Sequence, residues 1–256
     1  MQFEIEPFEI KLKGFPAKKG VLLEKEGRYS EVSPLPGRSI ETYQDALEQL
    51  HAVKKGWRGP LFPSVEFGIY GLIAPLAASV PCALFLYGTP DEVLKTAETA
   101  HGCTVAKLKV GHWTMDEALA VIRALPFKLR LDFNHLWESA KVHQLCAKLS
   151  PDQIEFLEDA GSSVPGFIEA VDERESPTIW KPMVRGLPSP REHLILSSSF
   201  ESSIGLHQIA SLIQSHQIPP HVLGIGTITH LEQDLVQNPA VLKDGKLHFP
   251  TSWILC

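Results

Sequence analysis

The stretch that decides the fold is Ala106-Lys107-Leu108-Lys109-Val110-Gly111. In a β-strand, successive side chains point to opposite faces, so Lys107 and Lys109 share one face. Two ammonium groups on one face repel each other, and burying them requires nearby anions. Crowding of this kind also lowers the pKa of a lysine toward the range of a useful base. The alternative interpretation is an edge strand that carries two solvated lysines.

Charged residues at the ends of later apolar runs favour the buried interpretation. Residues 128–134 alternate and bring Arg130, Asp132 and Asn134 to one face, and residues 154–159 end in carboxylates. Residues 167–173 repeat that form, and residues 178–182 contain a single lysine, Lys181. A (β/α) barrel places catalytic groups at such C-terminal strand ends. Three carboxylates from separate strands make a Mg²⁺ site, and flanking lysines supply acid/base chemistry.

These motifs resemble the enolase superfamily, in particular its muconate-lactonizing subgroup and the o-succinylbenzoate synthase family within it. The resemblance also rests on residues 33–37 followed by Glu41-Thr42, on residues 63–68, and on residues 197–205. It implies an α/β fold with an N-terminal α+β capping domain over residues 1–80. A shortened (β/α)8-type TIM barrel, of (β/α)7β form, follows over residues 81–235. Residues 236–256 are expected to pack back on the cap.

The resemblance also implies roles for individual residues. Lys109 is the expected base, Lys107 assists it, and Lys181 acts from the opposite side of the barrel. The implied metal ligands are Asp132, Glu158 and Asp172, with Asn134 supporting them; Glu169 and Glu173 remain alternatives to Asp172. The implied substrate-binding residues are Arg130, Ser198, Ser199, Pro36 and Gly37. Arg130 has a second interpretation, pairing with ligands, and the serine-rich segment has another, capping a helix through Ser202 or Ser203.

The reaction implied by the resemblance is a Mg²⁺-dependent dehydration, with Mn²⁺ as an alternative ion. Its substrate is 2-succinyl-6-hydroxy-2,4-cyclohexadiene-1-carboxylate, and its product is o-succinylbenzoate, a precursor in menaquinone biosynthesis. Two other interpretations remain open. One is an N-succinylamino acid racemase or dipeptide epimerase on the same scaffold, and the other is a non-catalytic remnant.

The spacing of the later strands departs from the family. Thirteen residues lie between Glu158 and Asp172, and eight lie between Asp172 and Lys181. A parallel crossover normally needs a dozen or more residues, so at least one outer helix must be missing or reduced to a turn. The barrel surface left bare predicts burial in a homo-oligomer or an unusual closure. At Glu158-Asp159-Ala160 the family's usual proline is absent.

Periodicity places the other elements. Residues 1–32 are predicted to form an antiparallel hairpin or meander, and eight parallel strands are expected near 82–87, 105–110, 128–133, 154–158, 168–172, 178–182, 193–198 and 221–226. Helices are expected at 40–55, 64–78, 91–100, 115–125, 137–149 and 205–214. The two prolines of residues 33–39 exclude helix and central strand. That stretch is either a connector or, as the resemblance implies, a loop over the barrel mouth near residues 33–40.

Composition limits the class of protein. The chain has 256 residues and a net charge of −6, so it lacks the basic character of a partner for nucleic acid or an anionic membrane surface. With no apolar run long enough to span a membrane, we expect a cytoplasmic protein that acts on a small molecule. The four scattered cysteines are expected to be reduced, and the eleven histidines lack the spacing of a zinc site.

Overall fold

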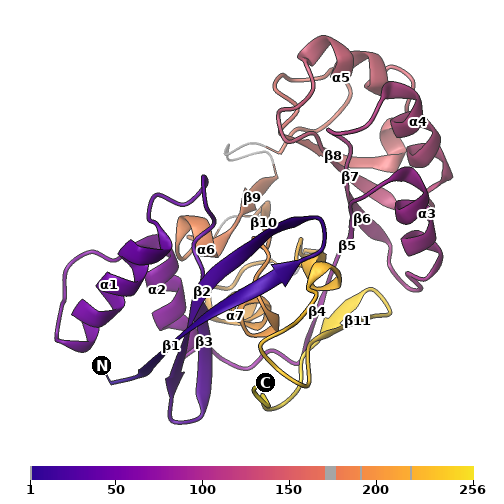
Figure 1. Ribbon diagram of the computed structural model, residues 1–256. Coiled ribbons are helices and arrows are strands. Elements are labelled where there is room, and N and C mark those ends of the chain that lie inside the picture. Colours follow the sequence, from indigo (N-terminus) through magenta and orange to yellow (C-terminus); the bar gives the residue numbers. More distant parts are fainter. Residues whose placement is uncertain (1, 171–176, 191, 220) are drawn as a thin grey trace.

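The structure is a computed structural model that describes residues 2–170, 177–190, 192–219 and 221–256. An antiparallel sheet with two helices lies on one side of the molecule, and a parallel sheet backed by three helices lies on the other (Figure 1). The fold is therefore of the α/β type. In the described residues, the structure contains no helix that is long and apolar enough to span a membrane. All four cysteines are free thiols, as expected.

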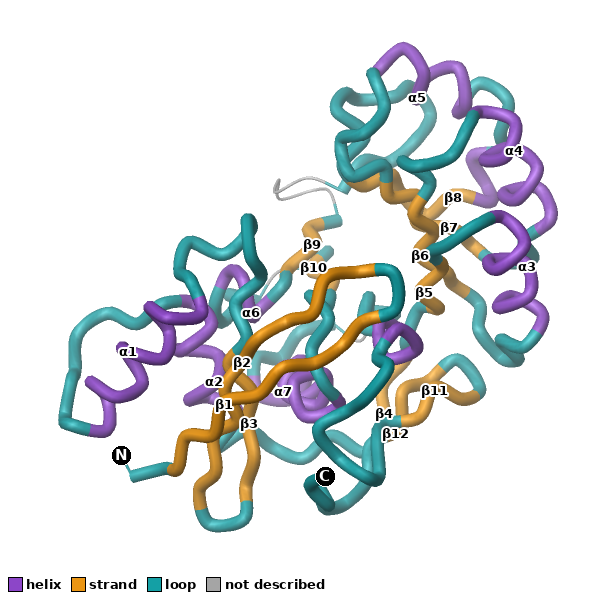
Figure 2. The backbone as a smooth tube through the Cα atoms, in the orientation of Figure 1, coloured by secondary structure: helices purple, strands orange, loops and turns teal. Residues whose placement is uncertain are grey.

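The N-terminal sheet is the predicted meander. Strands β1 (Glu4–Leu12), β2 (Phe15–Lys25) and β3 (Arg28–Val32) pair antiparallel in that order. Val21 and Leu23 of β2, with Val32 of β3, pack against helices α1 (Tyr43–Lys54) and α2 (Pro63–Gly71). The β1–β2 hairpin points toward the parallel sheet (Figure 2), where Phe15 lies 4.5 Å from Tyr87 between ring centroids. The hairpin therefore reaches the edge of the other layer.

The prediction of a helix over residues 64–78 is wrong in its second half, because α2 ends at Gly71. Pro75 has no backbone N–H, and the residue before a proline avoids the helical region, so the chain leaves the helix first. Gly71 also lies so close to Gln208 that an added Cβ would come within 2.6 Å of its amide. The chain then extends into β4 (Ser79–Pro81).

Four parallel strands form the sheet that carries the lysines. Their order is β5 (Leu84–Leu86), β6 (Val105–Lys109), β7 (Lys128–Asp132) and β8 (Ile154–Glu158). Helices α3 (Pro90–Glu98), α4 (Met115–Ala124) and α5 (Ser139–Cys146) bury their apolar sides against one face of this sheet. Helices α3 and α4, like α1, start at a capping box in which a threonine and the acid three residues later satisfy each other's amides.

The connections between the later strands are short, as predicted. Residues 159–170 contain turns and no helix, and they return to pair with β8 through one parallel bridge between Leu157 and Glu169. Strands β9 (Thr178–Trp180) and β10 (Leu194–Leu196) pair with each other, with only the four-residue α6 (Pro182–Arg185) between them among the described residues. Ile168, in this helix-free stretch, is 56% exposed.

Residues 221–226 connect the two parallel sheets. Leu223 pairs with Cys82 just before β5, and Gly224 pairs with Ser197 just after β10, both in parallel. Helix α7 (Ser203–Ser215) follows β10 and is buried along most of its length. Strands β11 (Val241–Lys243) and β12 (Lys246–His248) extend β4, and the short 3-10 helices Pro151–Gln153 and Gly226–His230 complete the chain. Val236 packs with Leu22 of β2 and Ile204 of α7.

Candidate active site

The last residues of three neighbouring strands lie in one row. The register pairs Lys109 of β6 with Asp132 of β7, and Asp132 with Glu158 of β8. Because the strands are parallel, these side chains emerge at the same edge of the sheet, and Lys107 lies two residues back on the same face. The strand ends therefore gather both lysines and two of the carboxylates that the sequence singled out.

These four side chains form one buried ion cluster. Lys107 Nζ lies 2.6 Å from Glu158 Oε2 and 2.9 Å from Asp132 Oδ2, and Lys109 Nζ lies 2.8 Å from Asp132 Oδ2. Lys107 is 7% exposed and Asp132 is 1% exposed. The edge-strand alternative is wrong, because β6 is paired on both sides and its lysines meet carboxylates instead of solvent.

The cluster shifts the pKa values of its members. Burial raises the pKa of Asp132, but the Lys107 and Lys109 ammonium groups outweigh that effect and hold it well below its usual range. Burial lowers the pKa of Lys107, yet the Glu158 and Asp132 carboxylates raise it overall. The expectation that crowding lowers a lysine pKa is thus wrong for Lys107. Lys181 does have a lowered pKa, first from burial and then from the charge of Lys107.

Two tight turns support the cluster. Asn134 and His135 after β7 have φ of +49° and +56°, and Asp159 after β8 has φ of +55°. The backbone N–H of Asn134 donates to Asp132 Oδ1 at 3.0 Å, and its side-chain Oδ1 accepts from Lys109 Nζ at 2.9 Å. His135 Nε2 lies 3.3 Å from Asp159 Oδ1. Left-handed backbone at non-glycine residues persists where the surroundings enforce it, and here it brings Asn134 to Lys109 and Asp159 to His135.

One group of three carboxylates could hold a metal ion. Asp132, Glu158 and Asp159 each place an oxygen within 4.8 Å of the others. Hard carboxylate oxygens fit a hard divalent cation. Such a cation would compete with Lys107, which pairs with both Asp132 and Glu158, for these oxygens. Asp159 was not among the predicted ligands, because Glu158 was taken as the sole ligand of that strand end; the adjacent second carboxylate was the available signal.

The third predicted acidic position falls in or beside residues 171–176. Asp172 and its alternative Glu173 lie outside the described residues. The other alternative, Glu169, is described, and its backbone pairs with Leu157 of β8. That pairing puts the 168–170 segment next to the strand that ends in Glu158.

Lys181 and the 33–40 loop reach the cluster from other elements. Lys181 follows β9 directly, and its Nζ lies 4.0 Å from Glu158 Oε1. Arg38 of the loop is 57% exposed at its side chain, and its Nη2 lies 4.0 Å from Asp159 Oδ2. Both side chains line a cavity of about 400 Å³ that also borders Glu158 and Asp159. Pro36 and Gly37 are exposed in this loop, with Gly37 at φ +75°. The loop is therefore more than a connector, since it extends to the end of β8.

Arg130 lies deeper in the parallel sheet than the cluster. Its guanidinium contacts Glu155 with Nε at 2.8 Å and donates from Nη2 to the Val222 carbonyl at 2.8 Å. An irregularity in the β7–β8 register lets Glu155 meet Arg130 although Glu158 lies on the inner face. Glu155 is near the start of β8, so Arg130 pairs with a carboxylate at the other end of that strand instead of joining Asp132.

Most polar groups of the serine-rich segment form hydrogen bonds within the protein. Ser202 caps α7, which confirms the capping alternative, and the Ser202 and Ser203 amides donate to Glu31 and Asp234. Ser198 Oγ lies 2.8 Å from Thr227 Oγ1, and the Ser199 N–H donates to Glu201 Oε2 at 2.7 Å. Ser198 and Ser199 follow β10, which pairs with β9, so they lie beside the strand that leads to Lys181. Their contact with substrate stays a prediction.

Similarity to known proteins agrees with this arrangement. The chain is 30% identical over 266 aligned residues to the o-succinylbenzoate synthase of Escherichia coli, which covers 84% of this chain and 82% of that protein. This chain belongs to the o-succinylbenzoate synthase family. The enzyme of that name from Klebsiella pneumoniae is 31% identical over 268 residues, with 84% and 83% covered. No family model matches the chain.

Solved structures agree with the fold. An o-succinylbenzoate synthase from Thermosynechococcus elongatus, complexed with Mg in its active site, matches with a TM-score of 0.65 at 22% identity, covering 91% of this chain and 95% of that one. The L-Ala-D/L-Glu epimerase of Bacillus subtilis matches with a TM-score of 0.73 at 13% identity, covering 100% and 99%. At these identities the likeness extends to the fold, which this family shares with epimerases.

Proposed function

We propose that the protein is a Mg²⁺-dependent o-succinylbenzoate synthase that dehydrates 2-succinyl-6-hydroxy-2,4-cyclohexadiene-1-carboxylate. The observation that carries the proposal is the row formed by Lys109, Asp132 and Glu158 at three adjacent strand ends, with Lys107 beneath it. The 30% identity to synthases over most of the chain supports the same reaction. The fold we propose is a (β/α)7β barrel over residues 81–235, covered by a capping domain of residues 1–80 and by residues 236–256.

Lys109 is proposed as the base and then the acid of this reaction. Its amine takes the proton from the carbon next to the substrate carboxylate, and the same group returns a proton to the hydroxyl that leaves as water. Removing one hydrogen and one hydroxyl completes the aromatic ring, so the products are o-succinylbenzoate and water. Asn134 Oδ1, 2.9 Å from Lys109 Nζ, holds the amine in place. Lys107 would donate to the substrate carboxylate.

The carboxylates are proposed to hold the ion. Asp132 and Glu158 are the proposed ligands, with Asp172 as the third and Asp159 as its alternative among the described residues. When bound, Mg²⁺ supplies positive charge to the substrate carboxylate while negative charge develops there. Lys181, whose pKa burial lowers, is proposed as a cation beside the ring on the opposite side from Lys109.

The test is turnover of the cyclohexadiene substrate, followed by absorbance with Mg²⁺, for the native protein and Lys109→Ala. Lys148→Ala, at an exposed position on the outer side, is the control. We expect the Lys109 variant to lose about 10³-fold or more in turnover, because general acid–base catalysis contributes about 10²–10⁴-fold. EDTA should abolish native turnover, and Mg²⁺ should restore it. A folded native protein without turnover would contradict the proposal.

A racemase or epimerase acting on N-succinylamino acids or dipeptides is the second candidate. It is favoured by the position of Lys181, which follows β9 and lies 4.0 Å from Glu158, since two lysines on opposite sides of a substrate can exchange protons on both faces. Solvent deuterium entering such a substrate, with loss of that exchange in Lys181→Ala, would support it. If Mg²⁺ titration of the native protein gives no binding, the chain is instead a non-catalytic remnant.

A further inference from the structure

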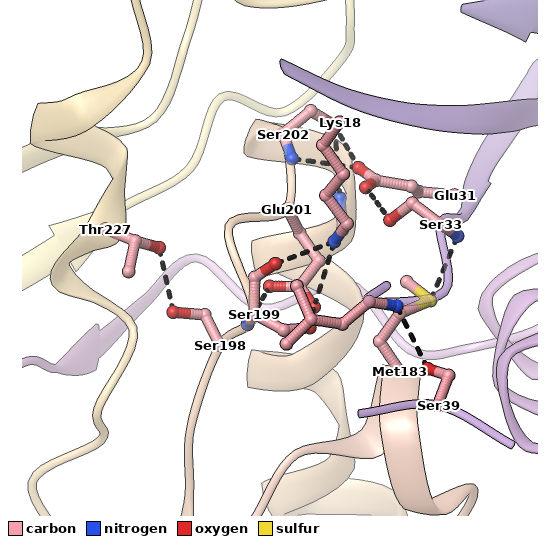
Figure 3. A network of polar contacts seen from close by, with 12 residues as sticks. Lys18, Glu31, Ser33, Ser39, Met183, Ser198, Ser199, Glu201, Ser202 and Thr227 are labelled. Atoms are coloured by element: carbon pink, nitrogen blue, oxygen red, sulfur yellow. Dashed lines mark hydrogen bonds and ion pairs between the residues drawn. The ribbon is translucent and has the colours of Figure 1, made fainter. Parts of the chain in front are cut away.

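A second buried charge cluster joins the N-terminal sheet to the start of α7 (Figure 3). Lys18 of β2 is 3% exposed, and Glu31 of β3 and Glu201 before α7 are both fully buried. These residues are separated by 170 or more positions from their partners across the cluster. None of them has a part in the proposed chemistry, yet burying three charges is costly unless each is paired.

Lys18 contacts Ser199, the last of the three consecutive serines of residues 197–199. Its Nζ donates to the Ser199 carbonyl at 2.7 Å and lies 3.9 Å from Glu201 Oε1. Glu201 in turn accepts from the Ser199 N–H at 2.7 Å and from the Ser199 hydroxyl at 2.5 Å. Both ends of Ser199 are therefore fixed by the Lys18–Glu201 pair.

The next residue, Phe200, has a strained backbone that β2 also holds. Its φ is +64°, in the left-handed region that a bulky side chain avoids unless its surroundings enforce it. The Phe200 ring lies 4.4 Å from that of Phe15, three residues before Lys18 on the same strand. Strand β2 thus contacts two consecutive residues of this turn, one by a buried ammonium and one by an aromatic ring.

Glu31 fixes the other side of the same turn. Its Oε2 accepts from the Ser202 N–H at 2.9 Å and from the Ser202 hydroxyl at 2.5 Å. Gly205 makes this approach possible, because an added Cβ would lie 2.7 Å from Glu31 Oε2. The backbone N–H of Glu31 also donates to Gln208 Oε1 of α7. The turn is consequently clamped between β2 and β3.

We propose that Lys18 is a positioning residue for substrate binding, because it fixes the Ser199–Phe200 turn beside the strand that leads to Lys181. The inference rests on the proposed function and on the prediction from the sequence that Ser198 and Ser199 contact the substrate. Lys18 acts through Ser199 and makes no contact with the proton-transfer groups. Its loss therefore weakens substrate binding and leaves the proton transfer by Lys109 in place.

The test separates positioning from simple charge pairing with three variants. Lys18→Met removes the hydrogen bond to Ser199 and leaves Glu201 without its cation. Lys18→Met with Glu201→Gln removes the charges of both members of this pair, so neither is left buried without the other, and we expect stability to recover toward that of the native protein. Lys19→Met, on the exposed face of the same strand, is the matched control.

In steady-state turnover, we expect both Lys18 variants to raise KM about tenfold, the effect of one hydrogen bond to a charged group, with kcat within about threefold. Lys18→Met alone should also melt at a lower temperature. A double variant that recovers the native KM together with its melting temperature would overturn the proposal, because Lys18 would then be only a counter-ion of Glu201. Unchanged KM in both variants would overturn it as well.

Amide hydrogen exchange tests whether Lys18 fixes this turn independently of whether the protein catalyses the proposed reaction. Amides of residues 199–203 should exchange at least about tenfold faster in the double variant than in Lys19→Met, whatever the substrate is. Faster exchange without any turnover would leave the positioning role intact and reject the synthase assignment. Exchange at the control rate would reject the positioning role even if the synthase reaction is observed.

Discussion

Two buried charge clusters in the part of the chain that the structure describes are satisfied in different ways. At the strand ends, Asp132 and Glu158 take their closest contacts from the ammonium groups of Lys107 and Lys109. Between the N-terminal sheet and α7, Glu31 and Glu201 instead accept hydrogen bonds from backbone amides and serine hydroxyls. The carboxylates at the strand ends are therefore paired with ammonium groups on flexible side chains. Glu31 and Glu201 accept from groups whose positions the backbone fixes.

This difference separates a candidate active site, at the strand ends, from a structural joint, where β2 and β3 meet the start of α7. An ammonium group can yield its carboxylate to another cation and move to a substrate, so the strand-end cluster can change partners during a reaction. A backbone amide at a helix start cannot move away without unfolding that turn. Substitutions should therefore affect metal binding in the first cluster and stability in the second.

Asp132→Asn should have the largest effect. The amide keeps the shape but removes the charge that Lys107 and Lys109 share and that a cation requires. We expect Mg²⁺ affinity to fall more than about 100-fold, the upper end for changes in groups that only support ligands. Calorimetric Mg²⁺ titration measures it, with Asp152→Asn on an exposed turn as the control. Equal Mg²⁺ affinity in both variants would remove Asp132 from the ion site.

Glu201→Gln should mainly reduce stability. It leaves Lys18, which is 3% exposed, without a full negative charge, and breaking a buried pair in this way typically costs about 3–5 kcal/mol. Urea unfolding of the variant gives the change in unfolding free energy. Mg²⁺ affinity should stay within about twofold of native, since the Glu201 carboxylate contacts Ser199 and Lys18 instead of the strand ends. A loss below about 1 kcal/mol would mean that Lys18 finds another partner.

The strand-end cluster was accessible from sequence because its signal is local. Alternation within residues 106–110 and 128–134 fixes which side chains share a face, and parallel pairing then aligns the strand ends. The capping boxes at Thr89 and Thr114 are equally local, and α3 and α4 begin close to where periodicity predicts. Asp159 escaped because its backbone turns left-handed, which brings it to the acids from a position that alternation assigns to the other face.

The joint between β2, β3 and α7 could not be predicted in this way. Lys18 and Ser199 are 181 positions apart, and nothing in either local pattern reports the other. In the sequence, Lys18 is an ordinary charged residue next to Lys19, and only the pairing of β2 with its neighbours buries one lysine and exposes the other. The sequence therefore left substrate binding and helix capping open for the serine-rich segment, and it did not reveal that Glu31 and Asp234 accept from the amides at the start of α7.

Glu31→Gln should have the smallest effect, and its sign depends on pH. Burial is the main reason that the pKa of Glu31 is raised above 4.5, opposed by Lys18 and reinforced by Glu201. Between the unfolded and folded pKa values the folded protein binds the extra proton, so this contribution to stability is present below pH 4.5 and is lost as the pH rises.

The amide introduced by Glu31→Gln cannot titrate, so the variant lacks that contribution. We expect native stability relative to Glu31→Gln to be higher at pH 4 than at pH 7, by about 1 kcal/mol or more. Urea unfolding at both pH values measures the difference, and Glu9→Gln on the exposed side of β1 serves as the control. The opposite sign would mean that Glu31 is ionised in the folded protein, held by Lys18. The cluster would then contain two carboxylates and one ammonium, and it would resemble the strand-end cluster more closely than its fixed donors suggest.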